Sequence, residues 1–200
     1  MDVREKVLAA ALQIIATDGP DAVSMREVAR RSGVSHQAPY HHFGDRAGIF
    51  AAITEDGYTM LAERFAAVLS SDVAPSRRCF EAYVSMAVEH PAHFRVMFRR
   101  DICGVNTHET TRAAADIAYA GLLQMVERTI GRPSGKKESV TWATLMWSSA
   151  HGLATLLVDG PLISKLPSGI SVNEHIDDVV SLMTEMVERQ AASMGLMPAR

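Results

Sequence analysis

Residues 24–50 carry the sequence SMREVARRSGVSHQAPYHHFGDRAGIF, which divides into two short helical segments separated by a turn. Ser24 and Glu27 have the spacing of a capping box, in which each side chain accepts a hydrogen bond from the backbone amide of the other residue. Gly33 ends the first segment, and Ser35 is the expected cap of a second helix that runs to Phe43. Two short helices joined by a glycine-containing turn are typical of a helix-turn-helix.

The second helix is rich in polar groups that a protein core does not need. Gln37 has the donor and acceptor pair that matches adenine, the methyl group of Ala38 matches that of thymine, and the hydroxyl and imidazole groups suit phosphates or base edges. The pattern predicts a DNA-contacting surface formed by Ser35, His36, Gln37, Ala38, Tyr40 and His41. For Tyr40 the alternative is a structural role in covering the outer face of the domain. His41 and His42 point about 100° apart on a helix, which disfavours a shared metal ion.

The composition limits the possible classes of protein. The 200 residues are 48% hydrophobic and 22% charged, which is normal for a globular chain of one or two domains. The net charge is −3, and residues 1–50 hold six Lys and Arg against six Asp and Glu, so any DNA contact must be local. Cys79 and Cys103 are too few for a disulfide framework or a four-cysteine zinc site, which fits a reducing compartment.

The remaining sequence divides at turn signals into further helical segments without a convincing series of strands. Few aromatic residues (6%) and eleven methionines favour helices over a β-sandwich. We therefore predict an all-α fold of about nine helices. The expected segments are one ending near residue 18, 24–32, 35–43, one from 45 to a break at 72–75, 76–90, 91–98, 110–130, 138–158 and a last one capped by Asn173. The expected core of the first three helices is Leu8, Leu12, Met25, Val28, Ala29, Val34 and Phe43.

Two apolar stretches imitate membrane or export signals. Residues 1–19 begin with four charged side chains and place their apolar residues on one stripe, which predicts an amphipathic helix rather than a secretory signal. Residues 140–158 contain no charged side chain, but threonine, serine, histidine and glycine interrupt the apolar run. This stretch is predicted to be a helix between protein surfaces, not a membrane span.

Residues 4–50 closely resemble the DNA-binding domain of TetR-family transcriptional regulators. The resemblance rests on the serine cap, the Val28-Ala29 pair, Gly-Val-Ser in the turn, Tyr-x-His-Phe at the end of the second helix and a basic residue after the next cap. It implies a helix-turn-helix domain over residues 1–47 and a helical ligand-binding and dimerisation domain over residues 48–200. The run Trp147-Ser148-Ser149-Ala150-His151-Gly152, with His90-Pro91, resembles a TetR subgroup that carries a W-x-x-x-H-G motif.

By position, the resemblance implies DNA contacts from Ser24, Arg26, Ser35, Gln37, Tyr40 and Arg46. Tyr40 and Arg46 would hold phosphates. The sequence departs from the family at two places. Arg46 stands where lysine is common, a change that keeps a phosphate contact, and Pro39 stands near positions that are often threonine or leucine.

The implied function is that of a cytoplasmic, homodimeric, sequence-specific repressor. It would read an inverted repeat in double-stranded DNA and be released by an apolar or amphipathic small-molecule effector, without a cofactor or metal ion. Candidate walls of the ligand pocket are Tyr58, Phe65, Phe80, Tyr83, Met97, Phe98, Met125, Trp147 and His151. Candidate dimer contacts on the last two long helices are Leu153, Leu157, Val179, Val180, Met183 and Val187.

Two other hypotheses compete with this one. In the first, the same DNA-binding end is switched by oxidation of Cys103 or by a metal ion at His90, His93 and His108. In the second, the chain is an enzyme or a ligand carrier, but it has no G-x-S-x-G, phosphate loop or metal-spaced His/Glu pair. His151 is either a hydrogen-bonded core histidine or a ligand contact, and the methionines either fill the core or line a pocket.

Overall fold

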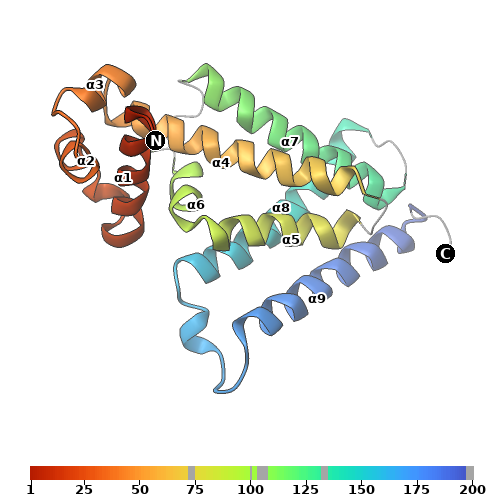
Figure 1. Ribbon diagram of the computed structural model, residues 1–200. Coiled ribbons are helices and arrows are strands. Elements are labelled where there is room, and N and C mark those ends of the chain that lie inside the picture. The colour runs from red at the N-terminus through yellow and green to blue at the C-terminus, as the bar shows by residue number, and fades with distance from the viewer. Residues whose placement is uncertain (72–74, 100, 103–107, 132–134, 197–200) are drawn as a thin grey trace. The chain divides into compact units, whose positions relative to one another are not determined.

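A computed structural model describes residues 1–71, 75–99, 101–102, 108–131 and 135–196. Over these residues it has nine α-helices, two short 3-10 turns and no strand, which confirms the all-α prediction (Figure 1). The helices are α1 (Val3–Asp18), α2 (Met25–Ser32), α3 (Ala38–Phe43), α4 (Arg46–Leu69), α5 (Pro75–Glu89), α6 (Pro91–Met97), α7 (Glu109–Ile130), α8 (Lys136–Val158) and α9 (Val172–Ser193). The 3-10 turns are η1 (Pro20–Ala22) and η3 (Ile163–Lys165).

Two helix starts differ from the expected ones. Ser35 does not cap α3, because residues 35–37 form a turn in which the Ala38 amide donates to the Ser35 carbonyl (3.0 Å), and the helix begins at Ala38 with Pro39 in its first turn. Asn173 does not cap α9 either. The His175 amide donates to the Ser171 carbonyl (3.0 Å), so the helix starts before Asn173.

The chain forms two compact units. The first contains residues 1–60 and 90–116, and the second contains residues 61–89 and 117–200. The first unit therefore extends beyond the domain of residues 1–47 that the sequence suggested, because the first half of α4 and all of α6 pack with α1. The domain boundary at residue 47 stays a prediction.

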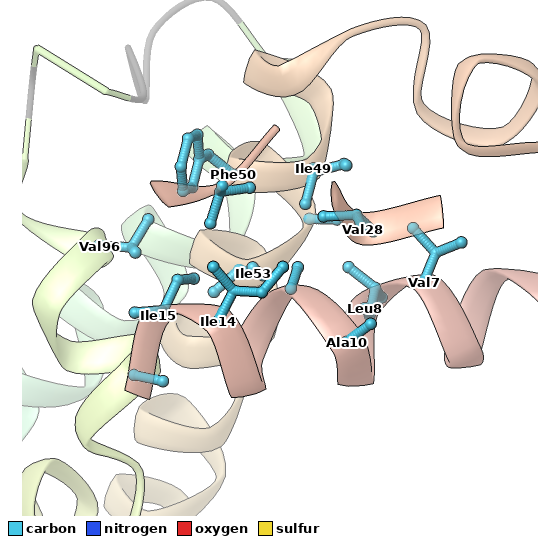
Figure 2. Close-up of a cluster of buried hydrophobic side chains, with 14 of the residues drawn as sticks. Val7, Leu8, Ala10, Ile14, Ile15, Val28, Ile49, Phe50, Ile53 and Val96 are labelled. Atoms are coloured by element: carbon cyan, nitrogen blue, oxygen red, sulfur yellow. The ribbon is translucent and has the colours of Figure 1, made fainter. Parts of the chain in front are cut away.

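Apolar side chains from α1, α2, α4 and α6 form the core of the first unit (Figure 2). Ile14 and Ile15 of α1 lie against Phe50 of α4 and Val96 of α6, and all four are inaccessible to solvent. Burial of such a side chain stabilises a fold by roughly 1.5–3 kcal/mol, so these contacts hold the helix-turn-helix on α4. Of the expected core residues, the structure buries Leu8, Met25, Val28 and Ala29, and it packs Leu12, Val34 and Phe43 as partly buried neighbours.

In the second unit α5 packs against both α8 and α9. Polar contacts fasten α5 to α9: Arg77 donates to Asp177 and to Ser181 Oγ (2.7 Å), and the buried Ser76 hydroxyl donates to a Glu188 carboxylate oxygen (2.6 Å). No helix in the described part of the chain is long and apolar enough to cross a membrane.

Candidate nucleic-acid interface

The start of α2 is set by Ser24, whose hydroxyl accepts the Glu27 amide at 3.2 Å. The reciprocal half of the capping box is replaced, because the Glu27 carboxylate accepts hydrogen bonds from Arg30 (2.6 and 2.9 Å) and Arg31 (2.8 Å). These bonds lower the pKa of Glu27 to about 2. Gly33 ends the helix at φ 67°, a left-handed conformation that glycine adopts without steric cost.

The turn and α3 expose the polar groups that the sequence singles out. Ser35, His36, Gln37, Tyr40 and His41 are exposed, Ala38 is partly exposed, and Pro39 is buried. The ring of His36 lies 5.9 Å from that of Tyr40. His42, which the sequence analysis did not include in the DNA-contacting set, is exposed beside His41. This surface offers hydrogen-bond donors and acceptors on a turn and the short helix that follows it, as a recognition helix requires.

Arg46 is held by the protein itself. Its guanidinium donates to the carbonyls of Val23 (2.8 Å) and Pro20 (3.0 Å), and its Cζ lies 4.8 Å from the centre of the Phe50 ring. The side chain thus ties the connection between α1 and α2 to the start of α4. A phosphate contact from Arg46 stays a prediction, and it must share the guanidinium with these carbonyls.

Several other cations near α3 are also engaged. Arg31 bonds Asp18 (2.5 Å) as well as Glu27, and the Cζ of Arg4 lies 5.6 Å from the centre of the Phe43 ring. Arg26, by contrast, is exposed and makes no ion pair among the described residues. Arg26 is therefore the most available arginine of α2 for a phosphate.

The expected pocket residues fall into two groups, one in each unit. In the first unit, the Tyr58 hydroxyl donates to the Met97 carbonyl (3.2 Å) and the Tyr58 ring meets that of Phe98 edge to face, with centres 6.0 Å apart. In the second unit, Tyr83 joins Trp147 and His151. The other three, Phe65, Phe80 and Met125, are buried in the second unit.

Tyr83, Trp147 and His151 are joined by two hydrogen bonds. The Trp147 Nε1–H donates to the Tyr83 hydroxyl oxygen (3.1 Å), and that hydroxyl lies 2.9 Å from His151 Nδ1. The phenol oxygen can accept a second hydrogen bond or donate its own hydrogen, so this contact fits a neutral imidazole with its hydrogen on either Nδ1 or Nε2. Burial lowers the pKa of His151, which favours this neutral form.

The expected dimer contacts lie mainly on the inner faces of α8 and α9. Leu153, Leu157, Val180 and Val187 are buried within the chain, and Val179 and Met183 are partly buried. The exposed apolar residues of these two helices are instead Val140, Leu145, Trp147, Leu156, Leu182 and Met186. A partner that met α8 and α9 would contact this second set.

The structure describes part of the set of cysteines and histidines on which a redox or metal switch could rest. Cys79 is buried, and burial raises the pKa of its thiol to about 12, which makes it unreactive. Cys103 lies outside the described residues. His90 and His93 have ring centres 5.7 Å apart, and burial together with the neighbouring His90 lowers the pKa of His93 to about 4. No cluster of three potential metal ligands occurs among the residues described.

Two family models match the chain. Residues 7–53 match the bacterial regulatory proteins of the tetR family, and residues 76–192 match the tetracyclin repressor-like C-terminal domain. No protein of curated function matches.

Solved structures share the fold. A protein of unknown function from Rhodococcus sp. RHA1 is 25% identical with a TM-score of 0.75, over 95% of both chains. A transcriptional regulator from the same organism is 22% identical with a TM-score of 0.68, over 94% of this chain and 96% of that one. The fatty acid degradation regulator FadR from Bacillus halodurans is 10% identical with a TM-score of 0.69, over 92% and 93%. At 22% and 10% identity, the last two show a shared fold alone.

Proposed function

Because the chain belongs to the tetR family of bacterial regulatory proteins, a family of DNA-binding transcriptional regulators rather than enzymes, we propose that it is a homodimeric repressor released from its operator by an amphipathic small molecule. The observation that carries the DNA-binding part is the exposed polar surface of the turn and α3. A bacterial regulator of this kind binds chromosomal DNA, so we propose that it is a cytoplasmic protein.

In this proposal α3 enters the major groove. Gln37 reads a base edge, Ala38 meets a thymine methyl group, and Tyr40 holds a phosphate. Ser24 and Arg26 at the start of α2 lie at the backbone, where the first helix of a helix-turn-helix crosses it. A two-fold dimer then reads two half-sites about one helical turn or a multiple of one turn apart.

The outer faces of α8 and α9 support the homodimer. Residues 139–158 contain no charged side chain, and Leu145 and Leu156 are nevertheless 46% exposed. On α9, Leu182 is 59% and Met186 is 71% exposed. Apolar side chains gathered on two long helices favour burial against a protein surface. A second copy of the chain is the partner that the family typically uses.

The cluster of Tyr83, Trp147 and His151 supports the effector site. Trp147 and His151 are the first and fifth residues of the W-x-x-x-H-G run, and both contact Tyr83. We propose that the chain belongs to that subgroup and that this run forms the polar end of the effector site. A neutral histidine suits a ligand with an uncharged polar group, and the neighbouring rings suit an apolar body. Within the first unit, Tyr58, Met97 and Phe98 are a separate set of candidate ligand contacts.

Release of DNA requires a difference in ligand affinity between two states. The effector must bind the state that does not fit the operator more tightly than the state that does, by a few kcal/mol. A ligand with equal affinity for both states shifts nothing, however tightly it binds.

Fluorescence anisotropy tests the DNA-binding part of the proposal. The purified protein is titrated into DNA from upstream of its own gene and into scrambled DNA, across a salt series. We expect the upstream DNA to bind more tightly by roughly 10³ or more. Purified protein extracted with solvent to remove any bound ligand serves as the second sample. If that sample also fails to distinguish the two DNAs, control of its own promoter is excluded, and if it binds neither DNA at low salt, the regulator proposal fails.

A further inference from the structure

We propose that His36, His41 and His42 supply the positive charge with which residues 33–44, the recognition segment, contact the DNA backbone. Operator affinity then rises as pH falls. This inference rests on the proposed function, because it assumes that α3 contacts DNA. It adds to that function a second input, the proton concentration, alongside the small-molecule effector.

The sequence of the recognition segment carries the first observation. Residues 33–44 read GVSHQAPYHHFG and contain no Lys, Arg, Asp or Glu, but they hold three of the eight histidines of the chain. A segment that contacts phosphates gains most of its affinity from positive charge. Within residues 33–44 only histidine can supply that charge.

The geometry of the three histidines is the second observation. All three are exposed, as a group that meets phosphate must be in the free protein. The rings of His41 and His42 have centres 5.4 Å apart, and the His36 ring lies beside Tyr40, the residue assigned to a phosphate. None of them belongs to a cluster of metal ligands among the described residues.

The charged groups around α3 are the third observation. On α1, Arg4 lies over the Phe43 ring, and on α2, Glu27 is bonded to Arg30 and Arg31. The Asp45 carboxylate, directly after α3, accepts the Gly48 amide (2.9 Å) and so caps α4. Glu27 is thus paired with two arginines, Asp45 with a backbone amide and Arg4 with an aromatic ring. Arg26 of α2, by contrast, is exposed and makes no ion pair among the described residues.

Arg46 belongs to the same surroundings. Its guanidinium is bonded to backbone carbonyls rather than exposed as a free cation. Outside the ion pairs of Glu27, Arg26 is therefore the exposed fixed cation of the neighbouring α2, and protonation of one to three histidines adds an equal or larger positive charge beside it.

The expected size follows from counterion release. Histidine is the side chain whose charge ordinarily changes between pH 5 and 8. Each additional cation at a phosphate steepens the dependence of log K on log salt by about 0.9, which is roughly a tenfold gain in affinity near 0.1 M salt. Protonation of one to three histidines at the backbone thus raises affinity by about 10-fold to 1,000-fold.

The test measures operator affinity by anisotropy at pH 8.0 and pH 5.5 over a salt series. We compare the wild-type protein with the triple variant His36→Gln, His41→Gln, His42→Gln, and with the single variant His175→Gln on α9 as the matched control. Circular dichroism at both pH values confirms that each protein is folded. The readout is the ratio of the affinities at the two pH values, so it does not depend on the absolute affinity of the variant.

We expect the wild type and His175→Gln to bind more tightly and with a steeper salt dependence at pH 5.5, and the triple variant to show a ratio near one. Equal wild-type affinities at the two pH values would overturn the inference, as would a triple variant that keeps the wild-type ratio. If the triple variant binds too weakly to measure, the single variants His36→Gln, His41→Gln and His42→Gln are used, and an unchanged salt slope at pH 5.5 in all three overturns the inference. Specific wild-type binding at pH 8.0 shows independently that the DNA-binding part of the proposed function holds.

Discussion

Residues 33–44, which include α3, and residues 139–158 of α8 both lack charged side chains, yet they present opposite surfaces to solvent. The recognition segment exposes imidazole, amide and phenol groups, whereas α8 exposes leucine, valine, tryptophan and small hydroxyl residues. The exposed groups of the first can exchange hydrogen bonds with water for hydrogen bonds with DNA. Those of α8 gain most from leaving water altogether. The absence of charge therefore indicates a contact surface in both places, and the exposed side chains indicate which kind.

The largest expected effect comes from placing a charge on α8. Leu156→Glu puts a carboxylate on the proposed self-interface, where burial of an unpaired charge is costly. We expect a monomer by sedimentation velocity at micromolar concentration and a loss of operator affinity of 100-fold or more, because one half-site is lost. Ile117→Glu, at a 63% exposed position on α7, is the control and should leave the mass unchanged. If the Leu156→Glu protein stays dimeric, α8 does not form part of the dimer interface.

Removing polar groups from the recognition segment tests the other side of the comparison. Gln37→Ala should cost about 1–3 kcal/mol of discrimination between operator and scrambled DNA, a factor of about 5 to 150, if Gln37 reads a base. Tyr40→Phe should weaken binding to both DNAs alike, because a phosphate contact carries no sequence information. Gln13→Ala, at an exposed position of α1, should change neither affinity. Equal losses for both DNAs in Gln37→Ala would assign Gln37 to the backbone instead.

Glu27 offers a smaller change of charge beside α3. Glu27→Gln releases Arg30 from its acidic partner, while Arg31 keeps Asp18. We expect affinity for both DNAs to rise by several-fold to about tenfold near 0.1 M salt, with a salt slope steeper by about 0.9. An unchanged slope would show that Arg30 does not approach the backbone.

The pH dependence of this ion pair is distinct from that of the histidines. The pKa of Glu27 in the folded protein is about 2, below the ordinary value of 4.5, so its contribution to stability is fully present above pH 4.5 and is lost as pH falls towards 2. Between pH 5.5 and 8.0 it is constant. Any pH dependence of operator binding in that range must then come from other groups.

Local signals in the sequence predicted the recognition unit well, because its determinants are close together in the chain. Ser24 caps α2, Gly33 ends it and Pro39 lies in the first turn of α3, each within a few residues of the feature it sets. Of the predicted capping box, the bond from the Glu27 amide to the Ser24 hydroxyl is present. The reciprocal bond was predicted wrongly, because Arg30 and Arg31 compete with the Ser24 amide for the Glu27 carboxylate. Sequence spacing alone does not show which of these donors prevails.

The rest of the molecule depends on contacts between distant segments. Tyr83 meets His151 across 68 residues, and no local pattern links the two. On α8, apolar residues occupy both faces, so the period of the sequence does not show which face is inside. The sequence predicts partner contacts from Leu153 and Leu157, but these two side chains are buried within the chain, while Leu145 and Leu156 are exposed.

The smallest expected effect concerns two buried threonines of the first unit, which differ in their hydrogen-bond partners. Thr54 on α4 and Thr111 on α7 are both inaccessible to solvent. The Thr111 hydroxyl donates to the Ala51 carbonyl (3.2 Å), whereas Thr54 Oγ1 has no hydrogen-bond partner among the described residues. A buried polar group without a partner costs free energy, and one with a partner contributes to stability.

Thr54→Val should therefore raise the free energy of unfolding by about 1 kcal/mol, and Thr111→Val should lower it by about 1 kcal/mol. Both changes replace a hydroxyl by a methyl group at a fully buried site, so each is the control for the other. Urea unfolding followed by circular dichroism measures the two midpoints, with the slope checked for constancy. If Thr54→Val is destabilised as much as Thr111→Val, the Thr54 hydroxyl has a partner in solution, and a buried water or a bound small molecule is then the group to look for.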